Sequence, residues 1–268
     1  MNNKKERTPA ELPSALEHFE EIAKKINQQR PLIFLDFDGT LAPIVEHYAD
    51  AAISDEMREL VKELAKKYPL AVVSGRGLAD VSNKAEIENI YYAGSHGFEI
   101  SGPNGFSKDH EEAEKVLPVF EKIEPMLKEE LKDIPGVDFE RKKFTLAVHY
   151  RQVAQEHEQQ VHDLVLKTVK NYPELSKAEG KKVIEIRPSI DWHKGKAVEF
   201  LKSQLGSGPA DFSIYVGDDV TDEDAFQYVD NNLGILVGEH SQNTYADYGV
   251  EDLEEVKELF RRILGNSL

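Results

Sequence analysis

The sequence predicts an α/β protein in which a smaller α+β domain is inserted into a doubly wound, mainly parallel sheet. Short, continuously apolar runs alternate with helical segments in the N-terminal and C-terminal parts of the 268-residue chain. Such runs are typical of strands that are buried on both faces. In the middle of the chain the alternation gives way to short strands in pairs and longer helices, which indicates a separate unit.

The N-terminal part is expected to begin with a helix and to continue with strand–helix repeats. Apolar residues recur at helical spacing over 16–26, and Thr8–Glu11 has the pattern of a capping box with proline at the first helical position. Residues 54–68 form a second amphipathic segment. The expected strands are the apolar runs 32–35, 70–73 and 90–93.

The pattern changes after Gly105 and returns at Lys194. In between, we expect helices at 116–132 and 154–171 and strands at 137–140, 144–150, 175–178 and 183–186. From Lys194 onward, apolar runs at 212–216 and 233–237 again alternate with helices. The simplest organisation has three parts: an N-terminal helical extension at 1–30, a core formed by 31–107 and 189–268, and an inserted domain at 108–188.

The chain is acidic, with a formal net charge of −17. This charge argues against nucleic acid as a partner, because the phosphate backbone would be repelled. Residues 141–196 differ from the rest, with 12 Lys or Arg against 7 Asp or Glu. Such a basic stretch either steers a small phosphorylated ligand toward a site or is an unevenly charged surface.

Composition also limits the compartment and the chemistry. No apolar run approaches the roughly 18 residues that a membrane span needs, and the polar first residues lack the apolar stretch of a secretory signal. We therefore expect a cytoplasmic, monomeric protein without a membrane partner. Because the chain has no cysteine, thiol nucleophiles and thiolate-bound zinc are excluded, and any metal must be bound through oxygen or imidazole.

Two carboxylates follow the first expected strand, in the segment Asp36-Phe37-Asp38-Gly39-Thr40. Ligands of open α/β sheets bind outside the carboxyl ends of the strands, so catalytic residues are expected here. Two carboxylates one residue apart suit a nucleophile beside a proton donor. The alternative is a simple turn, because Asp and Gly are common turn residues.

Other strand ends carry matching chemistry. The second strand stops at Ser74-Gly75, whose hydroxyl and amide suit a phosphate oxygen, and Lys194 opens a helix where an anion can bind. Five acidic residues lie between Gly217 and Asp224. They would repel one another unless they are exposed or hold a cation, and Mg²⁺ prefers such oxygen ligands. Each feature alone is also explained by helix capping or by a solvated charge.

Taken together, these motifs closely resemble those of the haloacid dehalogenase superfamily of phosphatases. The resemblance implies a Rossmann-like core with a large, C2-type cap domain and a Mg²⁺ cofactor. Asp36 would be the nucleophile that forms an aspartyl-phosphate, and Asp38 the general acid and base. The implied metal-site residues are Asp36, Asp38, Asp218, Asp219 and Asp222, and the implied phosphate-binding residues are Ser74, Gly75 and Lys194.

A narrower resemblance is to the trehalose-6-phosphate phosphatases. It is carried by Gly94–Glu99, by Phe139–Lys142 running into Ala147–Arg151, and by Val183–Pro188. It implies hydrolysis of trehalose 6-phosphate. The implied substrate-binding residues are Arg76, Glu140, Lys142 and Glu185.

Three alternatives remain open from the sequence. One is a phosphatase for another phosphosugar, such as sucrose phosphate or mannosylphosphoglycerate. The others are a sugar phosphomutase and a protein that binds a phosphosugar without turnover. The cap residues would then be solvated side chains on a hairpin edge.

Overall fold

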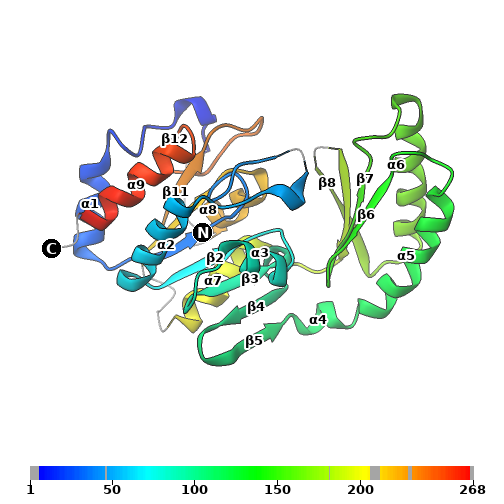
Figure 1. Cartoon of the computed structure of the whole chain (residues 1–268), viewed down its shortest axis with the longest axis horizontal. Helices are drawn as coiled ribbons and strands as arrows, with labels where there is room; N and C mark the ends of the chain where they lie inside the picture. Colours follow the sequence, from blue (N-terminus) through cyan, green and yellow to red (C-terminus); the bar gives the residue numbers. More distant parts are fainter. Residues whose placement is uncertain (1–5, 46, 181, 206–211, 229–230, 266–268) are drawn as a thin grey trace. The chain divides into compact units, whose positions relative to one another are not determined.

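A computed structural model of the chain describes residues 6–45, 47–180, 182–205, 212–228 and 231–265 (Figure 1). The chain forms two compact units. The first comprises the residues up to Lys108 and those from Trp192 onward, and the second comprises Asp109–Asp191. Each unit is described separately below.

The first unit is built on an eight-stranded sheet within the described residues, in the order β12-β11-β10-β1-β2-β3-β4-β5. Neighbouring strands from β12 to β3 are parallel, and β4 is antiparallel to β3. The strands are β1 Leu32–Leu35, β2 Leu70–Val73, β3 Tyr91–Gly94, β4 Glu99–Gly102, β5 Phe106–Asp109, β10 Ser213–Gly217, β11 Asn232–Val237 and β12 Tyr248–Val250.

The chain order reverses between β1 and β10. From β1 the chain moves outward through β2 and β3 on one side, and from β10 it moves outward through β11 and β12 on the other. The two central strands are in register, with Leu35 opposite Val216. The crevice at such a switch point is where open α/β sheets bind their ligands.

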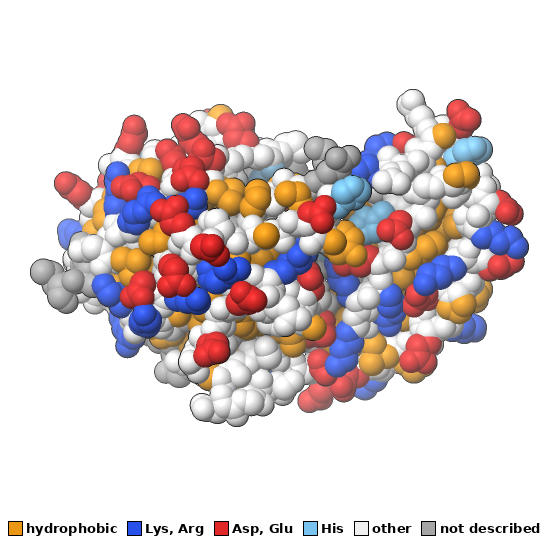
Figure 2. All heavy atoms as spheres, in the orientation of Figure 1, with side chains coloured by type: hydrophobic (Ala, Val, Ile, Leu, Met, Phe, Trp, Pro, Cys, Tyr) orange, Lys and Arg blue, Asp and Glu red, His pale blue; other side chains and the backbone are white. Residues whose placement is uncertain are grey.

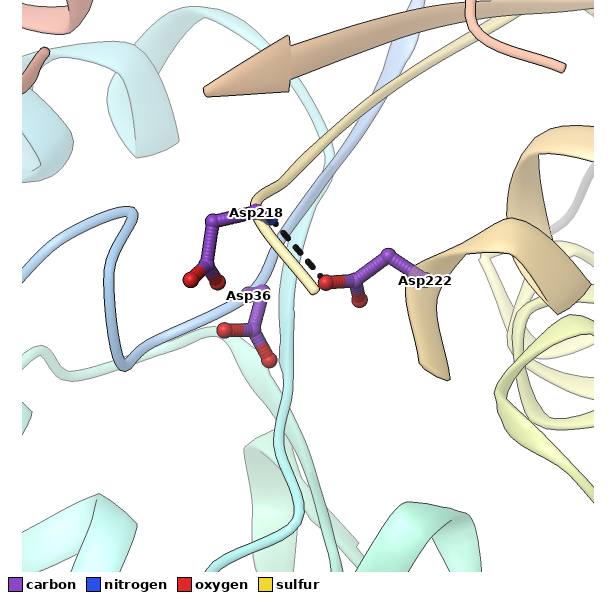
Figure 3. Close-up of side chains that lie close together, drawn as sticks. All are labelled: Asp36, Asp218 and Asp222. Carbon is purple, nitrogen blue, oxygen red and sulfur yellow. Dashed lines mark hydrogen bonds between the residues drawn. The ribbon is translucent and has the colours of Figure 1, made fainter. Parts of the chain in front are cut away.

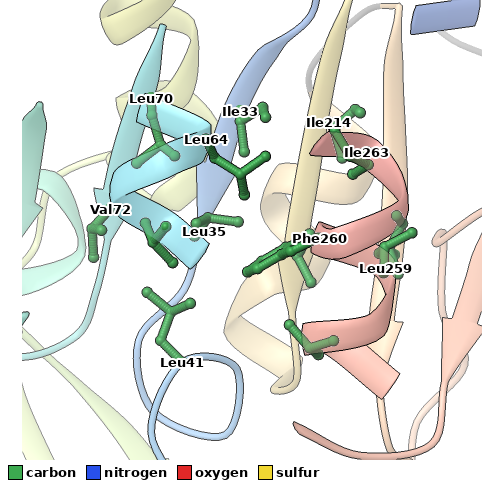
Figure 4. Close-up of a cluster of buried hydrophobic side chains, with 14 of the residues drawn as sticks. Ile33, Leu35, Leu41, Leu64, Leu70, Val72, Ile214, Leu259, Phe260 and Ile263 are labelled. Atoms are coloured by element: carbon green, nitrogen blue, oxygen red, sulfur yellow. The ribbon is translucent and has the colours of Figure 1, made fainter. Parts of the chain in front are cut away.

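Helices cover both faces of this sheet, because its central strands present apolar side chains alternately to each face. Ile33 and Leu35 belong to one apolar cluster, and Leu32 and Phe34 belong to another. Figure 4 shows the first cluster, which contains side chains of α2 and α9. The helices on this face are α1 Phe19–Gln28, α2 Asp55–Lys67, α3 Leu78–Ala85 and α9 Leu253–Gly265, and those on the other are α7 Lys194–Gln204 and α8 Glu223–Tyr228. The expected doubly wound fold is confirmed.

The segment before β1 differs from the expectation of one helix that begins near Thr8. The Thr8 amide donates to Glu11 Oε2 at 3.0 Å, but this capping box closes a single 3-10 turn, and α1 starts only at Phe19. In between, the backbone is bound to the sheet. The Ala15 amide donates to the Gly249 carbonyl at 2.8 Å, and the Gly249 amide donates to the Pro13 carbonyl at 2.9 Å. Pairing with β12 therefore replaces the expected first helical turns.

The second unit is an α+β layer pair. Its sheet is antiparallel in the order β6-β7-β9-β8, and one face packs on α5 and α6 through one apolar cluster. The opposite face carries Glu140, Ala147 and Glu185 in one cross-strand row. The elements are α4 Glu111–Glu114, α5 Leu117–Leu131, β6 Asp138–Arg141, β7 Leu146–His149, α6 Gln155–Lys170, β8 Leu175–Gly180 and β9 Val183–Pro188.

The surface over α2 and α9 mixes both signs of charge, as Figure 2 shows. Oppositely charged residues pair one helical turn apart. The distance is 2.8 Å both from Lys62 Nζ to Glu59 Oε1 and from Arg262 Nε to Glu258 Oε1. Each exposed pair contributes only a few tenths of a kcal/mol, roughly 0.3–0.5. Among the described residues no helix has both the length and the apolar character needed to cross a bilayer.

Candidate active site

Three carboxylates converge at the carboxyl ends of β1 and β10 (Figure 3). Asp36 directly follows β1, and its amide donates to the Val216 carbonyl at 2.9 Å. Asp218 directly follows β10, and Asp222 lies in the turn before α8. One carboxylate oxygen from each of these aspartates lies within 4.8 Å of the others. The switch point of the sheet thus brings together side chains from two distant segments.

One buried cation sits among these carboxylates. Lys194, the first residue of α7, is only 3% exposed. Its Nζ atom donates to Asp36 Oδ1 and to Asp222 Oδ1, both at 2.7 Å. A single ammonium beside three acidic groups leaves an excess of negative charge when all three are ionised. The cluster therefore has the charge to attract a further cation.

Burial, together with this excess of negative charge, raises the pKa values of the two strand-end aspartates. Burial raises the pKa of Asp36 to about 8, and the negative charge of Asp222 adds to that rise, whereas Lys194 opposes it. Burial likewise raises the pKa of Asp218 to about 9, with Asp36 contributing. Burial disfavours the charged form of Lys194, but the two carboxylates outweigh this and raise its pKa. A divalent cation would reverse the rise at the aspartates by stabilising their ionised forms.

The residues fit a hard divalent cation. Asp218 Oδ1 is buried and has no hydrogen-bond partner among the described residues, which is costly for a carboxylate unless a cation contacts it. Gly39 makes room for this carboxylate, because any Cβ atom there would overlap it. Gly39 also has a φ of +78°, which favours glycine. An oxygen donor set of this kind suits Mg²⁺.

Asp38 is held by an arginine from the next strand end. Arg76 Nε donates to Asp38 Oδ2 at 2.6 Å, and Arg76 Nη2 donates to Asp38 Oδ1 at 2.7 Å. The same guanidinium donates to Asp80 Oδ2 and to the Tyr48 carbonyl, both at 2.7 Å. Arg76 is 7% exposed. Such a bidentate pair fixes the orientation of the Asp38 carboxylate.

The loop after β2 brings two of the three predicted phosphate-binding residues, Ser74 and Gly75, to the same edge of the sheet. Ser74 is buried, and its Oγ accepts from the Arg76 amide at 3.1 Å. A Cβ atom at Gly75 would lie 2.9 Å from the His96 ring, so this loop passes close to an imidazole. The His96 amide donates to the Ser74 carbonyl at 2.9 Å. This loop is therefore tied to the turn that follows β3.

Asp219 behaves differently from its neighbours. Its side chain is exposed, and Oδ1 accepts from the Val220 amide at 2.7 Å, so it caps the turn before α8. It is not one of the three clustered carboxylates. Its place in the predicted metal site is therefore beside the cluster rather than in it.

A sequence model of the trehalose-phosphatase family matches residues 34–254. The chain belongs to this family. The match contains every site residue described above, and membership makes the chain a phosphatase.

Relatives and solved structures agree with the family. The chain is 43% identical over 276 residues to "Probable trehalose-phosphate phosphatase 2" of Oryza sativa subsp. japonica, and the match covers 94% of this chain and 72% of that protein. The crystal structure of a trehalose-6-phosphate phosphatase related protein superposes with a TM-score of 0.77 at 26% identity, covering 87% of this chain and 97% of the other. A haloacid dehalogenase-like hydrolase from Bacteroides thetaiotaomicron shares the fold, with a TM-score of 0.62 at 17% identity, covering 87% and 99%.

In this family member, the predicted sugar-binding residues form a cluster of their own in the second unit. Lys142 Nζ donates to Glu185 Oε1 at 3.1 Å and lies 3.9 Å from Glu140 Oε1. Glu140 Oε2 lies 3.3 Å from His149 Nε2. All four side chains are partly buried, between 14% and 30% exposed. Alternating charges at this spacing present donors and acceptors together, as vicinal hydroxyl groups require.

Two contact residues at the core site of this phosphatase were not predicted from sequence. Asp80 pairs with Arg76, and Tyr215 Oη donates to Asp222 Oδ1 at 2.6 Å. Asp80 lies in a helical first turn, where a carboxylate has an ordinary explanation. Tyr215 offered a clearer signal, because it is the one residue with a side-chain hydroxyl in the run Ile214–Val216, and a buried tyrosine hydroxyl needs a partner.

Proposed function

We propose that this phosphatase hydrolyses trehalose 6-phosphate to trehalose and phosphate through an aspartyl-phosphate on Asp36. The observation that carries the proposal is the buried group of Asp36, Lys194, Asp218 and Asp222 at the switch point of a trehalose-phosphatase fold. Asp36 is the only one of the three clustered aspartates that directly follows β1, the position expected for the nucleophile.

The reaction proceeds in two displacements. An Asp36 carboxylate oxygen attacks phosphorus while the bond from phosphorus to the sugar oxygen breaks, and Asp38 gives its proton to that oxygen. In the second step Asp38 takes a proton from water, the water oxygen attacks phosphorus, and the bond to Asp36 breaks. Lys194 orients Asp36 through Oδ1. Phosphate is released and both aspartates return to their starting states.

Mg²⁺ would neutralise negative charge on the phosphoryl oxygens. Asp36, Asp218 and the Asp38 backbone carbonyl would hold it, with Asp219 and Asp222 as supporting residues. The same negative charge is bound on the protein side by the Ser74 hydroxyl, the Gly75 amide and the Lys194 ammonium. In these assignments Mg²⁺ and the Lys194 ammonium, the two positive charges of the site, both contact Asp36.

The sugar would be recognised by Glu140, Lys142 and Glu185, since all three lie in one charged cluster on the second unit. Arg76 was predicted to bind substrate as well. Its contacts favour another role, because its guanidinium already binds Asp38, Asp80 and the Tyr48 carbonyl. We infer that Arg76 positions the Asp38 carboxylate.

Phosphate release from a panel of sugar phosphates tests the proposal, with and without Mg²⁺. Trehalose 6-phosphate is expected to stand well above sucrose phosphate and mannosylphosphoglycerate, and Asp36→Asn is expected to abolish release. Mg²⁺-dependent release that is equal across the panel would contradict the assignment of trehalose 6-phosphate. A requirement for a bisphosphate activator, with little phosphate released, would indicate a mutase instead.

A further inference from the structure

The Asp222 carboxylate is surrounded by four hydrogen-bond donors. Oδ1 accepts from Lys194 Nζ at 2.7 Å and from Tyr215 Oη at 2.6 Å. Oδ2 accepts from the amides of Asp218 at 3.1 Å and Asp219 at 3.0 Å. The side chain has no measurable exposure to solvent.

An ionised carboxylate offers about four lone-pair positions. At Asp222 the four donors occupy them, so no position is left for a cation. Asp218 is the opposite case, because its buried Oδ1 has no hydrogen-bond partner among the described residues. The two aspartates lie together yet differ in what they can still bind.

Tyr215 is built to stay in place. It belongs to β10, is fully buried, and packs edge-to-face on Phe226 of α8 with ring centroids 5.6 Å apart and an interplanar angle of 88°. Its ring therefore contacts the helix that begins directly after Asp222. The position of the hydroxyl is therefore fixed by the strand that holds the Tyr215 backbone and by the helix that packs against its ring.

We propose that Tyr215 is a positioning residue for the acidic loop Asp218–Asp222, which contributes Asp218 to the proposed cation site. Its hydroxyl completes the donor set of Asp222, which holds Asp222 away from the cation and fixes both Lys194 and the Asp218 amide. The cation is left to Asp36 and Asp218. The inference rests on the proposed function only in that both assign a cation to this site.

The alternative is that the hydroxyl serves stability alone. A purely structural hydroxyl would change the melting temperature without altering the affinity for Mg²⁺. Tyr92 provides a matched control, since its buried Oη donates to the Ile87 carbonyl at 2.8 Å and accepts from the Ile87 amide at 3.1 Å. It lies in β3 of the same sheet.

The test is calorimetric titration of the full chain with Mg²⁺, in the absence of substrate, for wild type, Tyr215→Phe and Tyr92→Phe. Loss of an outer partner of a metal site typically weakens metal affinity or activity by about 10–100-fold. We expect Kd for Mg²⁺ to rise about tenfold in Tyr215→Phe and to stay unchanged in Tyr92→Phe. With trehalose 6-phosphate at saturating Mg²⁺, kcat should fall while KM stays nearly constant.

A double mutant identifies the path. Since the hydroxyl acts through Asp222, adding Tyr215→Phe to Asp222→Asn should change Kd for Mg²⁺ no further. The comparison of Asp222→Asn with the double mutant does not need the single Tyr215→Phe protein, so it can be made even if that protein does not fold. An unchanged Kd in Tyr215→Phe, or full additivity with Asp222→Asn, would overturn the inference.

The outcomes separate the inference from the proposed function. If wild type binds Mg²⁺ and Tyr215→Phe weakens that binding, the inference stands even where trehalose 6-phosphate is not hydrolysed. If wild type hydrolyses this substrate and the variant binds Mg²⁺ equally well, the function stands and the inference fails. A wild-type protein that binds no Mg²⁺ would overturn both.

Discussion

At the scale of single residues, the site depends on what each carboxylate still has free. Asp36 binds Lys194 through one oxygen, Asp38 is paired with Arg76, and Asp219 caps a turn. Asp218 has one oxygen without a hydrogen-bond partner in the part of the chain that the structure describes. Neighbours in the sequence thus have different chemistry, because the backbone directs their side chains to different partners. Substitutions that remove charge but keep shape should reveal these differences.

Asp218→Asn and Asp219→Asn are a matched pair. The first removes an anionic oxygen from the proposed cation site, so kcat/KM should fall by about 100-fold or more, comparable to losing other electrostatic stabilisers. The second should have a small effect, because asparagine caps a helical turn about as well as aspartate. Phosphate release and Mg²⁺ titration measure both. Equal losses in the two variants would place Asp219 inside the metal site.

Arg76→Lys tests whether Arg76 positions Asp38 or binds substrate. Lysine cannot form the bidentate pair, so Asp38 loses its fixed orientation. We expect kcat to fall by about 10–100-fold, because losing the orientation removes only part of the roughly 100–10,000-fold that a general acid contributes, with little change in KM. If Arg76 contacts the sugar instead, KM should rise. Steady-state kinetics with trehalose 6-phosphate distinguishes the two results. Arg261→Lys on α9, where the side chain is 43% exposed, controls for a general effect of the same exchange.

At the scale of elements, the sequence predicted best those strands that are apolar throughout. β1, β2 and β10 are buried on both faces. β1 and β2 are continuous apolar runs, and β10 contains the run Ile214–Val216, so the pattern does not depend on context. β4, β5 and β12 were not predicted, because none is a continuous apolar run. β4 and β5 mix polar with apolar residues, and β12 has only three residues and contains Gly249. Their pairing is decided by neighbouring strands rather than by local pattern.

The same distinction applies to the site. Asp36, Lys194 and Asp218 were predicted, because each follows a buried strand or opens a helix, and those positions can be read from the sequence. The contacts of Tyr215 could not be, since its hydroxyl reaches Asp222 only when α8 packs on β10. For a side chain within a strand, the local sequence does not indicate which residue will be its hydrogen-bond partner.

The cross-strand row in the second unit gives an element-scale prediction. Glu185→Gln should raise KM and lower kcat for trehalose 6-phosphate, because Lys142 loses its ionic partner, yet leave hydrolysis of a small aryl phosphate nearly unchanged. Glu179→Gln, on the exposed end of neighbouring β8, is the matched control. Steady-state kinetics with both substrates measures the effect. An equal loss of activity on the two substrates would contradict the assignment of sugar recognition to this row of residues.

At the scale of the whole molecule, the buried acids couple stability to pH and to metal. Without a cation, the folded-state pKa values of Asp36 and Asp218, about 8 and about 9, lie above the ordinary value. Between the ordinary value and these values the folded state binds more protons than the unfolded state, so stability falls as pH rises. When the carboxylates are ionised and bind a cation, stability should instead rise with pH.

Thermal melts should display this coupling. In chelator, the melting temperature is expected to fall between pH 5 and pH 8 by at least about 2 °C, the shift that about 1 kcal/mol causes in a domain of this size. Saturating Mg²⁺ should reduce the fall, because binding favours the ionised site and stabilises the folded state. Asp218→Asn should flatten the curve in chelator. A melting temperature that is independent of pH in both conditions would show that these acids are not buried as described.

The hydrogen bond from Lys194 to Asp36 joins residues 158 positions apart. During synthesis Asp36, the proposed nucleophile, therefore leaves the ribosome long before its cationic partner Lys194, and the acidic loop after β10 comes later still. Contacts of such long range form slowly, because the intervening chain must first be ordered. The second unit is contiguous in sequence and has an apolar cluster of its own, and it is synthesised in this interval. The clustered carboxylates and Lys194 can therefore come together only after the residues up to Asp222 have been made.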